Sequence, residues 1–358
     1  MTRCGRKPAA GEKRGLQMSE PTAKKHERLA LAFAFRPSAA AGVFSAASLR
    51  RLGELCEVVA DEPLQSLDDS HGRAIMAKVE VLVTCWGCPR IDTAVLAQAP
   101  HLKLVAHAAG TIKSFIGAEV FERGVTVVNA ASANAMPVAE FTLAAILFAN
   151  KRVLAFRDLY RARREMTPWG ELSDPSVGNW RKTIGVVGAS RIGRRVIELL
   201  QPFGFDVLLY DPHVGKTGLA AHQVGLDELM RAADVVTLHA PALDSTAGMI
   251  NARRLSSMKD GATLINTARG SLVDQVALER ELISGRLSAV IDVTVPEVLA
   301  RTSPLYDLPN VLLTPHIAGA LGSERERLGA LVVDEVARFV TGKPLLHALS
   351  AATLHLQA

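Results

Sequence analysis

The sequence predicts an α/β protein built from two doubly wound domains, each with a parallel β-sheet. Short runs of β-branched residues alternate with amphipathic segments along most of the chain, which is the pattern of βαβ units. One strand-like run leads through a glycine turn into a helix-like segment at 183–195. With 358 residues, the chain is also long enough for two domains with separate cores.

The first part of the chain is expected to form one sheet flanked by helices. An apolar run such as Val79–Thr84 is typical of a strand that is buried on both faces. No glycine-rich phosphate turn follows any of these strands, so we do not expect this sheet to bind a nucleotide. The expected strands are 29–35, 58–59, 79–84, 102–106 and 125–129, and the expected helices are 44–56, a segment ending near 77, and 91–98.

A long helix is expected to join the two sheets. Residues Asn134–Leu154 are apolar nearly all round, which predicts burial between domains or between subunits. The long apolar run within this helix, Phe141–Ala149, is too short to cross a bilayer. The stretch 167–182 contains turn-forming residues and two tryptophans, and it is predicted to be a loop.

The segment Thr183–Arg195 is the strongest functional signal in the chain. A strand-like run ends at Gly188 and an amphipathic helix begins near Gly193, which is the setting in which a G-x-G-x-x-G fingerprint binds a dinucleotide in a Rossmann-like fold. Backbone N–H groups at the helix N-terminus would hold the pyrophosphate. Ser190 replaces the middle glycine; its Cβ takes up room, and its hydroxyl can donate to a phosphate instead. A structural βα unit that binds nothing is the alternative.

Asp211 extends this signal. It ends the next predicted strand, 18 residues after Gly193, where the fingerprint expects an acid that binds the adenosine ribose. Its charge favours NAD over NADP because a 2′-phosphate would be repelled. The following Pro212-His213-Val214 contains no arginine to receive that phosphate, and Lys216 is the nearest base. A turn former at the strand end is the alternative role for Asp211.

The formal charge of +5 is concentrated at the N-terminus. Residues 1–28 contain eight Lys or Arg and three acidic residues, and the remaining 33 basic and 33 acidic residues cancel. We therefore expect a disordered basic tail and a folded body with no electrostatic preference for nucleic acid. The tail is interpreted as a tag-like extension or an over-long start, with Met18 as the alternative first residue, rather than as a nucleic-acid-binding arm.

Cysteine usage and apolar runs indicate a cytoplasmic protein. Four cysteines in a chain of this length favour a reducing compartment over a disulfide scaffold. Leu29–Phe35 resembles a secretory signal, but Arg36-Pro37 interrupts it and a first strand explains it better. Cys85 and Cys88 have C-x-x-C spacing, yet no second ligand pair accompanies them. A loop with two thiols is therefore favoured over a redox pair, and no metal is expected.

Polar stretches follow the predicted strands of the second part, at the strand ends where doubly wound folds bind ligands. Arg269, Glu297 and His316 come from consecutive strand ends and are expected to converge. Arg269 would bind the oxygens of a 2-keto acid with two prongs, and His316 would donate the proton to the carbonyl oxygen. Glu297 would stabilise the imidazolium and fix the ring. The strands are expected at 206–211, 235–239, 262–267, 289–293 and 311–314, and a helix at 323–341 returns the chain to the first domain.

Five stretches of the chain resemble the D-isomer-specific 2-hydroxyacid dehydrogenase family. They are NAASANAMPVAE (129–140), GASRIG…YDP, NTARGSLVD, DVTVPE and TPHIAG, and the likeness runs from about residue 29 to the C-terminus. The resemblance implies homodimers of two Rossmann-like or flavodoxin-like domains, with the cofactor domain inserted into the substrate domain. The implied boundaries are a tail at 1–28, a substrate domain at 29–130 and 319–358, and an NAD-binding domain at 131–318.

The resemblance also implies roles for individual residues. Arg269, Glu297 and His316 match the catalytic residues of the family, and Asp292 matches a position that contacts the nicotinamide carboxamide. The implied NAD-binding set is Gly188, Ser190, Arg191, Ile192, Gly193, Asp211, His239, Pro241, Thr267, Ala268, Arg269, Asp292, His316 and Gly319. The implied substrate-binding set is Trp86, Gly87, Ala109, Gly110 and Arg269.

Two departures from the family pattern concern the substrate. Where the family has a Gly-x-Asp loop whose backbone holds the substrate carboxylate, this chain reads AAGTIKSFI at 108–116, so the N–H donors are left open. In the neighbouring loop, Trp86 is expected to add a bulky apolar wall. That wall favours a substrate with a sizeable side chain.

The expected function is the NAD-dependent interconversion of a small 2-keto acid and its D-2-hydroxy acid, without a nucleic-acid or membrane partner. The alternative is an NAD(H)-sensing binding protein, similar to the C-terminal-binding corepressors, because those relatives resemble the same Arg, Glu and His set. Formate oxidation is disfavoured because that branch pairs its histidine with Gln. Turnover of 2-keto acids distinguishes the two leading hypotheses.

Overall fold

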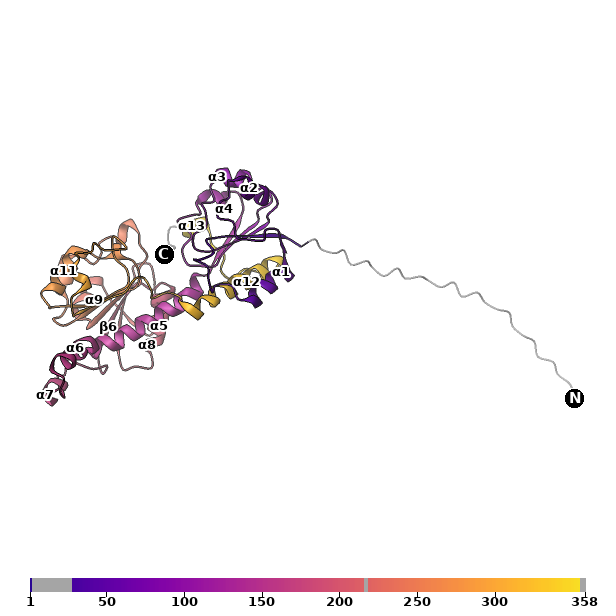
Figure 1. Cartoon of the computed structure of the whole chain (residues 1–358). Coiled ribbons are helices and arrows are strands. Elements are labelled where there is room, and N and C mark those ends of the chain that lie inside the picture. The colour runs from indigo at the N-terminus through magenta and orange to yellow at the C-terminus, as the bar shows by residue number, and fades with distance from the viewer. Residues whose placement is uncertain (2–27, 216–217, 355–358) are drawn as a thin grey trace.

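The computed structural model describes residue 1 and residues 28–354 except 216–217. Two parallel β-sheets form two lobes, and helices α5 and α12 lie where the lobes meet (Figure 1). This arrangement confirms the predicted class of two doubly wound α/β domains. The predicted disorder of the basic tail concerns residues 2–27, which lie outside the described part of the chain.

The first sheet has five parallel strands in the order β2-β1-β3-β4-β5. Side-chain caps begin the helices between them: Ser45, Asp69 and Asp92 each accept a hydrogen bond from a backbone N–H in the first turn of α1, α2 and α3. The elements are β1 Ala30–Ala34, α1 Ala46–Leu55, β2 Glu57–Val58, α2 Ser70–Met76, β3 Val81–Thr84, α3 Thr93–Ala97, β4 Leu104–His107, α4 Ala118–Glu122 and β5 Thr126–Asn129. The short helix α4 was not predicted.

The second sheet has seven parallel strands in the order β12-β11-β10-β9-β6-β7-β8. Helices α5 and α8 pack on one face and α9, α10 and α11 on the other, each through a buried apolar cluster. The strands are β6 Thr183–Val187, β7 Asp206–Tyr210, β8 His222–Gln223, β9 Val235–Leu238, β10 Thr263–Asn266, β11 Ser288–Ile291 and β12 Val311–Leu313. The helices are α8 Arg191–Leu200, α9 Leu226–Ala232, α10 Ala252–Ser257 and α11 Gln275–Ile283.

The long connecting helix differs from its prediction. Helix α5 spans Ala131–Asn150, so it begins and ends earlier than expected. Length and composition alone would allow α5 to cross a membrane, which corrects the estimate from its apolar run, but interior helices of globular proteins pass the same test. In this fold α5 packs against α8, α12 and strands β9 and β10, which accounts for its apolar surface.

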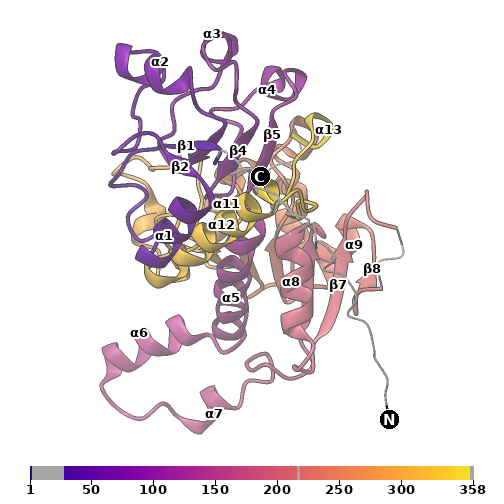
Figure 2. The same ribbon diagram turned by 90° about the vertical axis from the view of Figure 1, so that its right-hand side faces the viewer.

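A second helix, α6, follows α5 where the sequence predicted one continuous helix and then a loop. Arg152 adopts a left-handed conformation with φ 47°, which ends α5 and starts α6 at Val153–Arg163. A short helix, α7 at Trp169–Leu172, lies within the predicted loop. Helices α6 and α7 contain no buried residue and extend away from the sheet (Figure 2). We call residues 153–180 the arm.

Helix α12, Glu326–Val340, brings the chain back to the first sheet. It packs beside α1 and against β4 and β5, on the face opposite α2, α3 and α4 (Figure 1). Buried Glu335 accepts backbone N–H bonds from Leu346 and His347, so a satisfied carboxylate fixes the segment that leads to α13, Ala351–Leu354. We propose the residue boundaries given above for the two domains.

Two glycines in this helical layer give a prediction about the packing of α12. A Cβ on Gly329 would clash with the carbonyl oxygen of Val43, whereas a Cβ on Gly53 in α1 meets nothing within 4 Å. Gly329→Ala should therefore lower the free energy of unfolding by about 1–3 kcal/mol, as overpacking does. Gly53→Ala should raise it by about 0.5–1 kcal/mol, since alanine favours helix. Denaturant titration of both variants checks this; equal effects would contradict the close contact at Gly329.

Candidate active site

The glycine turn at the end of β6 is built as the fingerprint predicts. Gly188 has φ 99°, and a Cβ there would lie 2.7–2.9 Å from backbone atoms of His239 and Ala240. A Cβ on Gly193 would clash with the carbonyl oxygen of Gly188. Only glycine fits both positions. The backbone of 188–193 is therefore held close to the carboxyl end of β9, with the N-terminus of α8 open to a ligand.

Ser190 caps helix α8. Its Oγ accepts a hydrogen bond from the N–H of Gly193 at 3.3 Å, and its own hydroxyl proton remains available to a phosphate. This cap is a second reason for serine at the middle glycine position, and the sequence pattern alone does not indicate it. Arg191 and Ile192 form the first turn of α8, the former exposed and the latter half-buried.

Asp211 lies beside this turn at the carboxyl end of β7. Its carboxylate accepts the N–H of Ala189 at 2.7 Å and that of His213 at 2.8 Å. The first of these bonds joins the acid directly to the glycine turn. Each oxygen keeps a lone pair, so the side chain can also accept from a ribose hydroxyl. Lys216 lies outside the described residues.

His239 provides a separate indication that this region receives a ligand. The ring is buried, Nε2 is 3.0 Å from Thr237 Oγ1, and Nδ1 has no hydrogen-bond partner within the described chain. Burial lowers the pKa of His239 to about 3, so the ring is neutral. A buried polar atom without a partner is costly, and the neighbouring phosphate turn suggests what supplies the partner. Pro241, two residues on, is half-buried. The cradle and this nitrogen fit a dinucleotide.

Asn266, which the sequence analysis did not select, shapes the turn after β10. Its Nδ2 donates to the carbonyl oxygen of Arg269 at 2.9 Å, and its Oδ1 accepts the N–H of Ala268 at 3.1 Å. Thr267 is anchored to α5 through Thr142, with 3.1 Å between the two hydroxyl oxygens. The turn is thereby held at both ends. An asparagine at a strand end is too common in turns to have been singled out.

Arg269 lies at the end of this turn, directly before the 3-10 helix η2, Gly270–Leu272. One guanidinium nitrogen donates to the carbonyl oxygen of Ala268 at 2.6 Å. The pKa of Arg269 is lowered overall, because burial lowers it by more than the carboxylate of Glu297 raises it. The remaining donors of the guanidinium are the two-pronged surface that a carboxylate or a keto oxygen matches.

His316 and Glu297 form the hydrogen-bonded pair that the sequence predicted, between His316 Nδ1 and Glu297 Oε1. The two residues follow the adjacent strands β12 and β11, and Arg269 follows β10, so the sheet brings the three strand ends together. Both side chains of the pair are about half exposed, at 51% and 57%. Since Nδ1 faces the carboxylate, Nε2 is the ring atom available to a substrate.

Asp292 organises the loop that carries His316. Its buried carboxylate accepts from the hydroxyl of Thr314 at 2.6 Å and from the N–H groups of Ile317 and Ala318 at 2.7 and 2.9 Å. Its carbonyl oxygen accepts the N–H of His316 at 3.0 Å, and His316 has a left-handed φ of 55°. The acid expected to contact nicotinamide thus also fixes the catalytic candidate.

Gly319 follows in the same loop, against the start of α5. A Cβ there would lie 3.1 Å from Asn134 Oδ1, and that oxygen accepts the N–H of the next residue, Ala320, at 2.9 Å. Asn134 therefore ties the loop after β12 to the interdomain helix.

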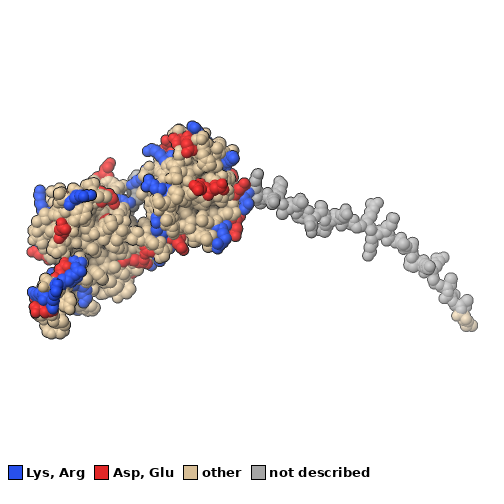
Figure 3. Space-filling view, in the orientation of Figure 1, with Lys and Arg blue, Asp and Glu red and all other residues tan. Residues whose placement is uncertain are grey.

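The substrate-side loops follow β3 and β4 in the first lobe, across the hollow between the lobes (Figure 3). Ala109 and Gly110 donate no backbone hydrogen bond within residues 28–354, so their N–H groups are available to a carboxylate. Gly87 has φ 79° and no room for a Cβ beside Arg36. The expected apolar wall at Trp86 needs correction, because the guanidinium of Arg325 lies over its ring, 4.8 Å from the centroid.

The thiols of Cys85 and Cys88 have the character of buried groups. Burial raises the pKa of Cys85 to about 11 and that of Cys88 further, so neither is a thiolate at neutral pH. Each donates to a backbone carbonyl, of Ala108 and Pro89 respectively. Within the described residues no cluster of His, Cys, Asp or Glu has the arrangement of a metal site.

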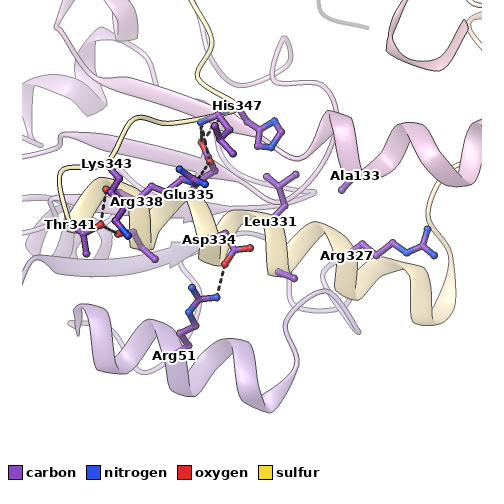
Figure 4. Close-up of a pocket in the computed structure, with 13 residues that line it drawn as sticks. Arg51, Ala133, Arg327, Leu331, Asp334, Glu335, Arg338, Thr341, Lys343 and His347 are labelled. Carbon is purple, nitrogen blue, oxygen red and sulfur yellow. Dashed lines mark hydrogen bonds and ion pairs between the residues drawn. The ribbon is translucent and has the colours of Figure 1, made fainter. Parts of the chain in front are cut away.

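A separate cavity of about 820 Å³ lies along α12, between α1 and the start of α5 (Figure 4). Arg51 pairs there with Asp334 at 2.6 Å, and Arg338 lies 3.8 Å from buried Glu335. None of the predicted site residues lines it. The Arg51–Asp334 pair joins α1 to α12, and Glu335 accepts the N–H groups of Leu346 and His347 in the C-terminal segment. The cavity is therefore distinct from the candidate active site.

Comparisons with known proteins agree with this geometry. Residues 143–318 match the model of the D-isomer specific 2-hydroxyacid dehydrogenase, NAD binding domain. A glyoxylate reductase of Korarchaeum cryptofilum is 32% identical over 257 residues, covering 71% of this chain and 77% of that protein. The solved structure of the TT0316 protein from Thermus thermophilus is 30% identical, with a TM-score of 0.69, and covers 90% of this chain and all of that one.

These matches define a two-domain α/β protein with an NAD-binding domain. The chain belongs to the D-isomer specific 2-hydroxyacid dehydrogenase family. A D-3-phosphoglycerate dehydrogenase of Mycobacterium tuberculosis is 35% identical over 257 residues, covering 71% of this chain but only 48% of that protein. The chain therefore spans about half the length of the phosphoglycerate dehydrogenases that it matches.

The buried neutral histidines give a prediction about stability and pH. Burial lowers the pKa of both His107 and His239 to about 3, from an ordinary value of 6.5. Below pH 6.5 the unfolded chain binds protons at these sites and the folded chain does not, so stability falls as pH falls. Each site should contribute a slope of up to about 1.4 kcal/mol per pH unit.

Denaturant titrations between pH 7 and 5.5 measure this slope. His107→Gln should reduce the slope by the contribution of one histidine, whatever the effect of the substitution on stability at pH 7. A parent stability that is flat over this range would contradict the buried neutral state.

Proposed function

We propose that the protein is an NAD-dependent oxidoreductase that interconverts a small 2-keto acid and the corresponding D-2-hydroxy acid. The observation that carries this proposal is the convergence of Arg269 and the His316–Glu297 pair at three adjacent strand ends, in the sheet that also carries the glycine turn. The glyoxylate reductase among its relatives supports the same class of reaction.

Different residues of the chain bind the substrate, transfer the proton and position the proton donor. Bound NADH supplies a hydride. Arg269 holds the substrate carboxylate and polarises the keto oxygen, and the N–H groups of Ala109 and Gly110 bind the carboxylate from the other lobe. His316 gives a proton from Nε2 to the keto oxygen and removes it in the reverse direction. Glu297 stabilises the imidazolium and holds the ring in place.

The first test removes the proposed acid–base group. His316→Ala should lower kcat for 2-keto acid reduction by about 10²–10⁴, the usual contribution of a positioned proton donor, with NADH affinity nearly unchanged. Steady-state kinetics and NADH fluorescence titration measure the two quantities. Arg269→Lys should also lower kcat/KM despite its charge, because one ammonium cannot make a two-pronged contact. Parent-like turnover by His316→Ala would overturn the proposed acid–base role, whereas absence of turnover in the parent protein would favour an NAD(H)-binding protein.

We also infer that Asp211 selects NAD over NADP. Its carboxylate lies at the glycine turn, where the 2′-position of an adenosine ribose would approach it. Asp211→Asn keeps an acceptor for the N–H of Ala189 but removes the negative charge. The ratio of kcat/KM for NADH to that for NADPH should then fall by about tenfold or more. A parent enzyme that prefers NADPH would contradict this assignment.

We further propose that the protein is a homodimer and that the arm packs on a second copy of the chain. The arm exposes large apolar side chains while α6 and α7 bury none of their own, and Lys and Arg gather on it (Figure 3). The most exposed large apolar residues of the arm are Tyr160, Met166, Trp169 and Trp180, between 60% and 78%. Apolar surface of this extent favours burial in an interface.

Charge substitutions on the arm test the dimer. Met166→Asp with Trp169→Asp should shift the mass measured by light scattering from that of two chains to that of one. The thermal stability of the separated chains should change little, since neither residue contributes to a buried core. Leu49→Asp, an exposed position in α1, should remain dimeric. A parent that is already monomeric would overturn the proposal.

We propose that the protein acts in the cytoplasm on a small acid, with no nucleic-acid or membrane partner. The cancellation of 33 basic and 33 acidic residues outside the first 28 supports the absence of a nucleic-acid partner, because it leaves no net charge to attract polyanions.

A further inference from the structure

The turn after β4 is held by a buried side chain that has no part in the chemistry above. The carbonyl oxygen of Ala109 accepts the N–H of Ala130 at 3.0 Å, and the carbonyl oxygen of Gly110 accepts Nδ2 of Asn129 at 2.7 Å. Asn129 is the last residue of β5, and its side chain is 2% exposed. Two successive carbonyl groups of the turn are therefore fixed against the carboxyl end of β5.

These two bonds determine where the N–H groups of the turn point. A trans peptide is planar, so its N–H points opposite to its C=O, and the peptides of this turn are trans. The N–H of Gly110 shares a peptide with the carbonyl of Ala109, and the N–H of Thr111 shares one with the carbonyl of Gly110. Both N–H groups therefore point away from β5. Neither donates a hydrogen bond to any residue that the structure describes, and Thr111 is exposed.

The two ends of the stretch 108–116 are fixed as well. His107, which directly precedes the stretch, has Nδ1 2.9 Å from Thr84 Oγ1 in β3, and both side chains are buried. The ring of His107 packs on that of Phe115, near the far end of the stretch, with 4.7 Å between the ring centroids. The turn is thus held at β3, at β5 and across its own ends.

A turn that is held in this way suits a carboxylate. Successive backbone N–H groups in a turn form a concavity that binds anions. Donors that are already ordered lose little conformational entropy when the ligand binds, so they add affinity at a low cost. The N–H of Thr111 is therefore a third donor beside those of Ala109 and Gly110, on the turn that lies across the hollow from Arg269.

We propose that Asn129 is a positioning residue for the substrate carboxylate. It holds the carbonyl of Gly110, so that the N–H of Thr111 joins those of Ala109 and Gly110 as a carboxylate donor, and His107 assists by fixing the ends of the turn. This inference rests on the proposed function, and it assigns the donors in the stretch where the sequence departs from the Gly-x-Asp pattern.

Asn129→Ala tests this role with glyoxylate, whose binding depends on its carboxylate because it has no side chain. KM should rise about tenfold while kcat stays within about twofold of the parent value, since a carboxylate contact contributes equally to the ground state and the transition state. Oxamate, a non-reacting amide analogue with the same carboxylate, should bind the protein–NADH complex about tenfold more weakly in calorimetry. NADH affinity should not change.

Control variants separate positioning from a loss of folded protein, which would lower kcat and leave KM unchanged. Asn310 is a matched control at the opposite end of the second sheet, where its Nδ2 donates to the carbonyl oxygens of Leu282 and Leu287 at 2.9 and 2.7 Å. Asn310→Ala should leave KM unchanged. Thr84→Val removes the hydroxyl beside His107 and should raise KM about two- to fivefold, whereas Thr84→Ser keeps the hydroxyl and should retain the parent KM.

The possible results are distinguishable. Parent-like KM and oxamate affinity in Asn129→Ala, or a fall in kcat alone, would overturn the positioning role and leave the proposed function intact. An unchanged KM in Thr84→Val would overturn the part assigned to His107. If the parent turns over no 2-keto acid but binds oxamate more tightly than Asn129→Ala does, the positioning role is supported and the proposed function fails. If the parent neither turns over a 2-keto acid nor binds oxamate, both fail.

Discussion

The candidate active site depends on the buried carboxylate of Asp292. A buried charge is stable only if its oxygens are satisfied, and here Thr314, Ile317 and Ala318 supply three donors from one short loop. Meeting that requirement folds the loop after β12 tightly enough to hold His316 at a left-handed φ of 55°. The proton-transfer candidate is thus positioned by the electrostatic needs of a neighbouring strand end, and the pair with Glu297 fixes only its ring.

The second sheet places the rest of the site around this loop. Arg269, Glu297 and His316 belong to three strands that are adjacent in the sheet, so their separation is set by the spacing of β10, β11 and β12. The glycine turn lies further along the same edge, after β6. Proximity of a hydride donor to the acid–base pair therefore follows from parallel strand order, without long loops. This is why a doubly wound sheet suits chemistry between a nucleotide and a small acid.

The elements and site residues that could be predicted from the sequence are those that depend on a local pattern of residues. Apolar strands, the Gly188–Gly193 turn and the strand-end polar residues are each read from a few neighbouring residues, and the fold has them where they were expected. Features set by distant contacts could not be read in this way. No glycine or proline lies at Arg152 to mark the break between α5 and α6, and the two short elements α4 and β8 left only a weak signal. The stacking of Arg325 on Trp86 joins residues far apart in the chain, so an apolar wall was the natural expectation for Trp86 alone.

Substrate binding and the arrangement of the two lobes are coupled, because both lobes contribute to the proposed site. The proposed carboxylate ligands come from both lobes, Ala109 and Gly110 from the first and Arg269 from the second. A substrate carboxylate would contact both sets of donors only when the lobes lie close together, so it would bind that arrangement more tightly than one with the lobes further apart. A ligand shifts a conformational equilibrium only through such a difference in affinity. Substrate binding would therefore also exclude water from the half-exposed His316 during hydride transfer.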